Sequence, residues 1–99
     1  MLEKDITNAI LRYLRTLPGC FCWKEHGGPY SQAGIPDIIC CYRGRFVAFE
    51  VKTATGKLSK LQAVTLERIR AAGGRAHMVT SVAQVRKIIE KIDKEGLPP

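Results

Sequence analysis

The sequence predicts a single α/β domain, a mixed β-sheet flanked by helices with elements in the order αβββαβα. Apolar residues recur at three- and four-residue spacings in three segments, and four short runs rich in β-branched and aromatic residues lie between them. Glycine or proline separates most of these segments. The chain has 99 residues, the length of one domain with a modest core. We assign residues 1–95 to this domain and residues 96–99 to a short tail.

The helices are predicted from apolar stripes and from the residues at their ends. The first covers residues 2–17, where Pro18-Gly19 stops it, and its stripe is Leu2, Ile6, Ala9, Ile10, Tyr13, Leu14 and Leu17. The second covers residues 59–72 and opens with SKLQ, which has the pattern of a capping box. The third follows SVAQ, a second such pattern that begins at residue 81.

The strands are predicted at residues 20–25, 37–42, 46–52 and 75–79. The second and third are close enough to form a hairpin with Arg43-Gly44 as its two-residue turn. Tyr42 would then pair with Arg45, and counting back along the ladder places Asp37 opposite Glu50 on one face of the sheet.

The charge of the chain favours a polyanionic partner. Sixteen Lys and Arg residues against nine Asp and Glu give a formal net charge of +7. Nucleic acid is the first candidate and an anionic membrane surface the second, while a merely solubilising surface is the alternative. The apolar runs are too short for a membrane span, so we expect a cytoplasmic protein, or one of the host-cell cytoplasm if it is viral, with no membrane partner.

The four cysteines do not have the spacing of a zinc site. Cys20 and Cys22 are spaced C-x-C, Cys40 and Cys41 are adjacent, and neither pair matches the C-x2-C of zinc ribbons. All four lie in apolar, strand-like segments. We therefore expect buried, reduced thiols that pack as small apolar side chains.

The residues that point to chemistry gather at the hairpin. Asp37 and Glu50 would repel each other unless a cation lay between them, and their hard oxygen ligands suit Mg²⁺ or Mn²⁺. Lys52 shares the face of Glu50, and the carbonyl of Val51, which lies between their side chains, is a candidate for a further metal ligand. The alternative is structural: Glu50 and Lys52 form a salt bridge on an exposed face, and Asp37 caps a turn after Pro36.

A family resemblance rests on these same residues. GIPDII at residues 34–39, FEVK at residues 49–52, Gln62 in the next helix and Glu3 in the first resemble the PD-(D/E)XK nuclease superfamily. More narrowly, the chain is similar to the small standalone form of VRR-NUC, the virus-type replication and repair nucleases. The resemblance implies a restriction-endonuclease-like core and a metal-dependent DNA endonuclease.

The resemblance also implies roles for single residues. Asp37 and Glu50 match the metal-binding acids and Lys52 the catalytic lysine, whereas Glu3 and Gln62 match helix residues that turn toward the site. For Glu3 the alternative is a favourable interaction with the helix dipole. For Gln62 it is the capping box itself.

Polar residues around the hairpin are candidates for DNA contacts. Lys24, Tyr30, Ser31 and Gln32 lie in or before the glycine-rich loop that precedes Asp37. Lys57 and Lys60 flank the start of the second helix, whose N-terminus favours phosphate. A solvated surface charge is the alternative for each lysine.

One active site per chain suggests a homodimer, because a break in both strands needs two sites. The small proteins that this chain resembles are dimers that act on branched DNA, so a Holliday-junction-resolving activity is the expected function. The dimer interface would involve exposed apolar residues of the first or last helix, or neighbours of the third strand. The rivals are a nicking or restriction-like nuclease of linear duplex and a non-catalytic module that binds DNA structures. The sequence has no Walker loop, dinucleotide fingerprint or Ser-His-Asp pattern, so no small-molecule cofactor is expected.

Overall fold

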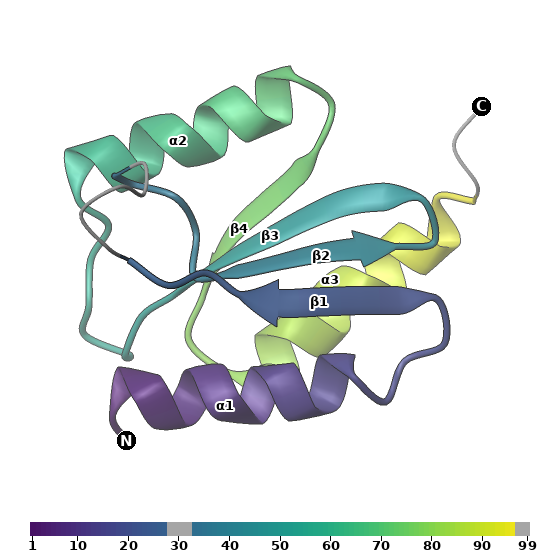
Figure 1. Cartoon of the computed structure of the whole chain (residues 1–99), viewed down its shortest axis with the longest axis horizontal. Coiled ribbons are helices and arrows are strands. Elements are labelled where there is room, and N and C mark those ends of the chain that lie inside the picture. The colour runs from purple at the N-terminus through teal and green to yellow at the C-terminus, as the bar shows by residue number, and fades with distance from the viewer. Residues whose placement is uncertain (28–32, 97–99) are drawn as a thin grey trace.

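A computed structural model of the chain describes residues 1–27 and 33–96, and its elements follow the predicted order. They are α1 (Glu3–Leu14), β1 (Cys20–Lys24), β2 (Ile38–Tyr42), β3 (Arg45–Val51), α2 (Lys60–Ala71), β4 (Arg75–Val79) and α3 (Val82–Lys94). The sheet forms the middle layer, with α1 and α3 on one face and α2 on the other (Figure 1). The predicted α/β fold class is confirmed. None of the described helices is long and apolar enough to cross a membrane.

The sheet is mixed, with the strand order β1-β2-β3-β4. β1, β2 and β3 pair antiparallel, while β4 runs parallel to β3 after the crossover through α2. The hairpin has the predicted register, from Tyr42 opposite Arg45 to Ile38 opposite Phe49. Arg43 and Gly44 both have positive φ, at 48° and 83°, as a two-residue turn that follows the twist of its strands requires.

Alternation along the strands divides the core into two parts. The larger part, between the sheet and helices α1 and α3, contains Ile10, Leu14, Phe49 and Val51, all fully buried. The smaller part, beneath α2, contains Ile39, Ala48, Leu66 and Ala76. Since Phe49 and Val51 face the larger core, Glu50 between them faces the α2 side.

The helix ends differ from the prediction by up to three residues. α1 ends at Leu14, and the chain continues through turns in which Thr16 N donates to Tyr13 O and Leu17 N to Leu14 O. Leu2 was expected on the buried stripe but is 70% exposed. The capping box of α2 is complete. The second box is only half formed, because the Gln84 side chain accepts from Thr80 N and not from Ser81 N.

The prediction that all four cysteines are buried holds for two of them and is wrong for Cys41. Cys22 and Cys40 are buried and Cys20 is partly exposed, but Cys41 is exposed. Cys40 and Cys41 are successive strand residues and must face opposite sides of the sheet. Cys41 thus points to the face of α2, on a part of the sheet where its cross-strand neighbours Phe21 and Phe46 are also exposed, at 71% and 46%. Phe46 and its neighbours are among the surfaces expected for a dimer seam.

Candidate metal-binding and catalytic site

Asp37 and Glu50 lie side by side where the hairpin ladder ends, as the register predicts. Ile38 and Phe49 form the last pair, and Asp37 precedes β2 by one residue. The Oδ2 atom of Asp37 accepts a hydrogen bond from the backbone N of Val51 at 2.7 Å. This bond holds the carboxylate against β3. Asp37 therefore does not cap a turn after Pro36, as the structural alternative supposed.

The segment before Asp37 is fixed by two contacts. The carbonyl of Asp37 accepts from Glu25 N at 2.8 Å, which ties it to the end of β1. Gly34 has φ +84°, and a Cβ atom there would lie 2.8 Å from Leu61 Cγ and 2.9 Å from Thr65 Oγ1 of α2. Only a glycine fits so close to the helix in this backbone conformation. The close packing of this loop on α2 sets the point where Asp37 enters the site.

Glu50 is a buried acid with an incomplete counter-charge. Glu50 is only 2% exposed. Burial, then a hydrogen bond to Asp37 and the charge of Asp37, raise the pKa of Glu50 to about 8, although Lys52 acts in the opposite direction. The carboxyl pair is thus poorly solvated and mutually repulsive when both members are ionised. Such a pair is stabilised by a cation between its members.

Lys52 reaches the acid pair from just beyond β3. Its Nζ atom lies 3.9 Å from Glu50 Oε2, the outer limit of an ion pair, and its side chain is only 15% exposed. The backbone N of Lys52 donates to Val79 O at 3.0 Å, which holds it beside β4. The same-face pairing of Glu50 and Lys52 is therefore present. The expected alternative, a salt bridge on an exposed sheet face, does not describe this buried position.

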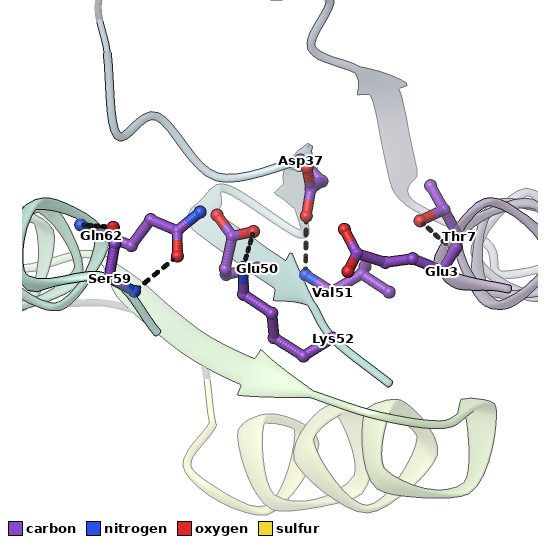
Figure 2. A network of polar contacts seen from close by, with 8 residues as sticks. All are labelled: Glu3, Thr7, Asp37, Glu50, Val51, Lys52, Ser59 and Gln62. Atoms are coloured by element: carbon purple, nitrogen blue, oxygen red, sulfur yellow. Dashed lines mark hydrogen bonds and ion pairs between the residues drawn. The ribbon is translucent and has the colours of Figure 1, made fainter. Parts of the chain in front are cut away.

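Two helices direct further polar side chains toward the acids from opposite sides (Figure 2). In α2, Gln62 Oε1 accepts from Ser59 N at 2.9 Å, so the capping alternative is real, but the amide nitrogen of the same side chain points toward Glu50. In α1, Glu3 extends toward Asp37. Among the described residues, the carboxylates of Glu3, Asp37 and Glu50 do not form a cluster within 4.8 Å. Glu3 lies at the edge of the site and is exposed.

The residues expected to contact DNA are only partly described. Lys57 and Lys60 are exposed beside the N-terminus of α2, and Lys24 is partly buried at the end of β1. Tyr30, Ser31 and Gln32 lie outside the described residues. A cavity of about 480 Å³ opens beside Asp37 and is lined by Glu25, His26, Gly27 and residues 33–35. This cavity gives a ligand access to the Asp37 side of the acid pair.

A second cluster was not predicted from the sequence. The sulfur atoms of Cys20, Cys22 and Cys40 lie within 4.8 Å of one another on the α1 and α3 face of the sheet. The cysteine spacing along one strand does not predict this cluster, because the cluster joins residues of two strands, β1 and β2. A long loop joins these strands, so no tight turn fixes their register in advance. The only usable signal was the C-x-C spacing, which places two thiols on one face.

Comparison with known proteins adds to this geometry. No protein-family model matches the chain, and no curated protein matches it. A solved structure described as a VRR-NUC domain is similar with a TM-score of 0.75 and 28% identity, covering 89% of this chain and 94% of that one. A second, described as a VRR-NUC domain protein, has a TM-score of 0.74 and 16% identity, covering 98% of this chain and 92% of that one. These likenesses support the resemblance to the VRR-NUC family. The VRR-NUC domain is a nuclease-family fold, which confirms the resemblance seen in GIPDII and FEVK.

The acid pair of this chain fits a hard divalent cation. Both ligands are carboxylates, and Oδ1 of Asp37 has no backbone donor that competes for it among the described contacts. A dication would also remove the repulsion that raises the pKa of Glu50. This hard donor set of carboxylate oxygens suits Mg²⁺ or Mn²⁺.

Proposed function

We propose that this chain is a VRR-NUC-type, metal-dependent endonuclease that hydrolyses phosphodiester bonds in DNA, with Mg²⁺ or Mn²⁺ held by Asp37, Glu50 and the carbonyl of Val51. The observation that carries the proposal is the carboxyl of Glu50, which is buried beside Asp37. Its pKa is raised to about 8. A buried carboxyl beside a second carboxylate is costly for folding, and a cation bound for catalysis would explain its presence.

The bound ion would neutralise charge on the scissile phosphate and lower the pKa of an attacking water. The chain supplies the rest. Lys52 orients or deprotonates that water, or stabilises the charge of the transition state from its place beside Glu50. The amide nitrogen of Gln62 faces Glu50 and would donate to its carboxylate or to the water, and Glu3 approaches from the Asp37 side.

The substrate we propose is branched DNA, such as a four-way junction, cut by a homodimer. Each chain carries one set of Asp37, Glu50 and Lys52, so paired cuts in two strands require two chains. The net charge of +7 supports a polyanionic substrate. We assign phosphate or base contacts to Lys24, Tyr30, Ser31, Gln32, Lys57 and Lys60.

The first experiment is a cleavage assay on an end-labelled four-way junction and a linear duplex of matched sequence. Each is incubated with Mg²⁺, with Mn²⁺ and with EDTA. We expect metal-dependent, paired cuts in the junction that are lost in Asp37→Ala and Glu50→Ala but kept in Glu67→Ala. Glu67 is an exposed acid of α2 paired with Arg70, and so controls for loss of a charge.

The other results of this assay identify the rival functions. Full activity in Asp37→Ala or Glu50→Ala would overturn the metal-site assignment. Single nicks in the linear duplex, with no preference for the junction, would identify a nicking or restriction-like nuclease. Binding of the junction without cleavage under any metal would identify a non-catalytic DNA-binding module.

The homodimer needs a test of its own. We expect sedimentation to show a dimer and, in mixtures of wild type with Glu50→Ala, heterodimers with one active site. Such heterodimers should nick a cruciform plasmid in one strand, whereas the wild type linearises it. A monomer at all concentrations, or linearisation in proportion to the wild-type fraction alone, would contradict the paired-site proposal.

A further inference from the structure

The face of the sheet opposite the acid pair carries the cluster of three thiols from Cys20, Cys22 and Cys40. Cys20 and Cys22 alternate along β1 and thus share a face, and Cys22 stands directly opposite Cys40 in the β1–β2 ladder. Their three sulfur atoms lie within 4.8 Å of one another. The cluster arises from two strands that are fixed by five backbone pairs, so its geometry is set before any ligand arrives.

The surroundings of the cluster are apolar except at one side. Cys40 is 1% exposed and Cys22 is 9% exposed, and both belong to the larger core with Leu14 and Tyr42. Cys20 is partly exposed and provides the path to solvent. Burial is also the main reason that the pKa of Cys20 is raised to about 11 and that of Cys40 is raised. Burial therefore favours the protonated thiols of Cys20 and Cys40 when no ion is bound.

We propose that Cys20, Cys22 and Cys40 form a binding site for one thiophilic divalent cation, Zn²⁺ or Cd²⁺, with a water as fourth ligand on the side of Cys20. Tetrahedral zinc with bonds to sulfur of about 2.3 Å separates its sulfur ligands by about 3.8 Å. The observed cluster reaches this spacing by side-chain adjustments of about 1 Å.

Charge and softness select the class of ion. Three thiolates and a dication leave one net negative charge beside the core, whereas a monovalent ion leaves two, which costs more in apolar surroundings. Mg²⁺ prefers oxygen ligands and does not compete for this site. The thiol site is therefore distinct from the acid pair in its position and in its metal.

The consequence of binding is structural. β1 is an edge strand with β2 as its one neighbour in the sheet, and an ion held by both strands cross-links them. Because unfolding scatters the three ligands, binding should raise the melting temperature. At an ion concentration 100 times the dissociation constant we expect a rise of at least about 10 °C.

The test uses the full chain, reduced with a phosphine and freed of metal, in a Glu50→Ala background that removes the acid site. Zn²⁺ is titrated against a chromophoric chelator, and Co²⁺ is used as a spectroscopic substitute whose near-ultraviolet charge-transfer band reports bonds to sulfur. We expect one ion per chain, release of protons on binding, and the band characteristic of thiolate ligation.

The matched control is Cys41→Ala, which removes a neighbouring cysteine on the other face of the sheet. It should bind like the parent protein. Cys20→Ala, Cys22→Ala and Cys40→Ala should each weaken Zn²⁺ by roughly 100-fold or more and remove the thermal shift. Cys20 is partly exposed, so Cys20→Ala keeps the test valid if the variants of the buried positions do not fold.

Three results would overturn the proposal. The first is a reduced protein that binds no Zn²⁺ or Cd²⁺. The second is binding that survives in Cys20→Ala, or that is lost equally in Cys41→Ala. The third is a protein that binds no ion but forms a Cys22–Cys40 disulfide in air, which would identify a redox pair in its place.

Discussion

The electrostatics of a single residue, Glu50, set the chemistry of the candidate site. An ionised carboxylate is costly to bury unless a counter-charge lies close to it. Lys52, at 3.9 Å, compensates only part of this cost, and Asp37 increases it. The nearby charges therefore do not offset the cost of burying the ionised carboxylate, and the pKa of Glu50 rises to about 8. In the metal-free protein the imbalance must appear as a dependence of stability on pH.

We expect the free energy of unfolding of the metal-free protein to fall as the pH rises from about 4.5 to about 8. Between these values the folded protein holds a proton on Glu50 that the unfolded chain releases, so raising the pH favours unfolding. Denaturant titrations across this range measure the slope. Glu50→Gln should remove this fall in stability. The surface control Glu67→Gln should keep it. A wild type with flat stability would refute the assignment.

Lys52 gives a second prediction at the residue scale. Lys52→Ala should lower the cleavage rate by roughly 10²- to 10⁴-fold, the range for loss of a group that transfers a proton, while Mn²⁺ still binds. Calorimetric titration measures the second part, and lost Mn²⁺ affinity would contradict the role. Lys52→Arg separates the mechanisms: it keeps the charge but cannot release a proton, so recovered activity would indicate electrostatic stabilisation alone.

At the scale of elements, the site depends on how the loop before β2 packs against α2. The capping box fixes the first turn of α2 and holds the oxygen of Gln62, so that its amide nitrogen faces Glu50. Gly34 permits the close approach of loop and helix. The element order and the α2 capping box follow from local sequence patterns, whereas this packing depends on residues from two separate segments.

Gly34→Ala should destabilise the protein by about 2–3 kcal/mol, because the new Cβ meets Leu61 and Thr65 in a left-handed backbone conformation. A thermal melt should show a fall of about 10 °C or more. The control is Gly27→Ala, where no atom lies within 4 Å of the added Cβ. We also expect reduced cleavage at temperatures where the variant is folded. Equal melting temperatures in the two variants would contradict the close packing.

At the scale of the whole molecule, excess positive charge accompanies the acid pair on the face of α2. Lys57 and Lys60 are exposed at the N-terminus of that helix, close in sequence to Lys52 and Gln62. Lys91 and Lys94 lie on α3, which covers the other face of the sheet. We therefore expect Lys57 and Lys60 to neutralise the phosphates of DNA bound at the acids and so to release its counterions, whereas Lys91 and Lys94 should do so much less.

We expect the logarithm of DNA affinity to fall linearly with the logarithm of salt concentration. The double variant Lys57→Ala/Lys60→Ala should make this slope shallower by about 2, since each phosphate contact contributes about 0.9. Fluorescence anisotropy in EDTA measures it without cleavage. Lys91→Ala/Lys94→Ala is the control of equal charge. An equal change in both double variants would show that only the net charge of the molecule matters.

The sequence by itself determined the order of the elements, the hairpin register and hence the meeting of Asp37 with Glu50. Those features follow from local rules: the period of apolar residues, the two-residue turn and the alternation of strand faces. Only the tertiary structure decided that Glu50 is buried, that Gln62 faces it, that Glu3 stays at the edge, and that three thiols meet between β1 and β2. Each of these depends on segments joined by a long loop or a crossover, whose relative placement is set by packing of the whole core and by no turn or local period.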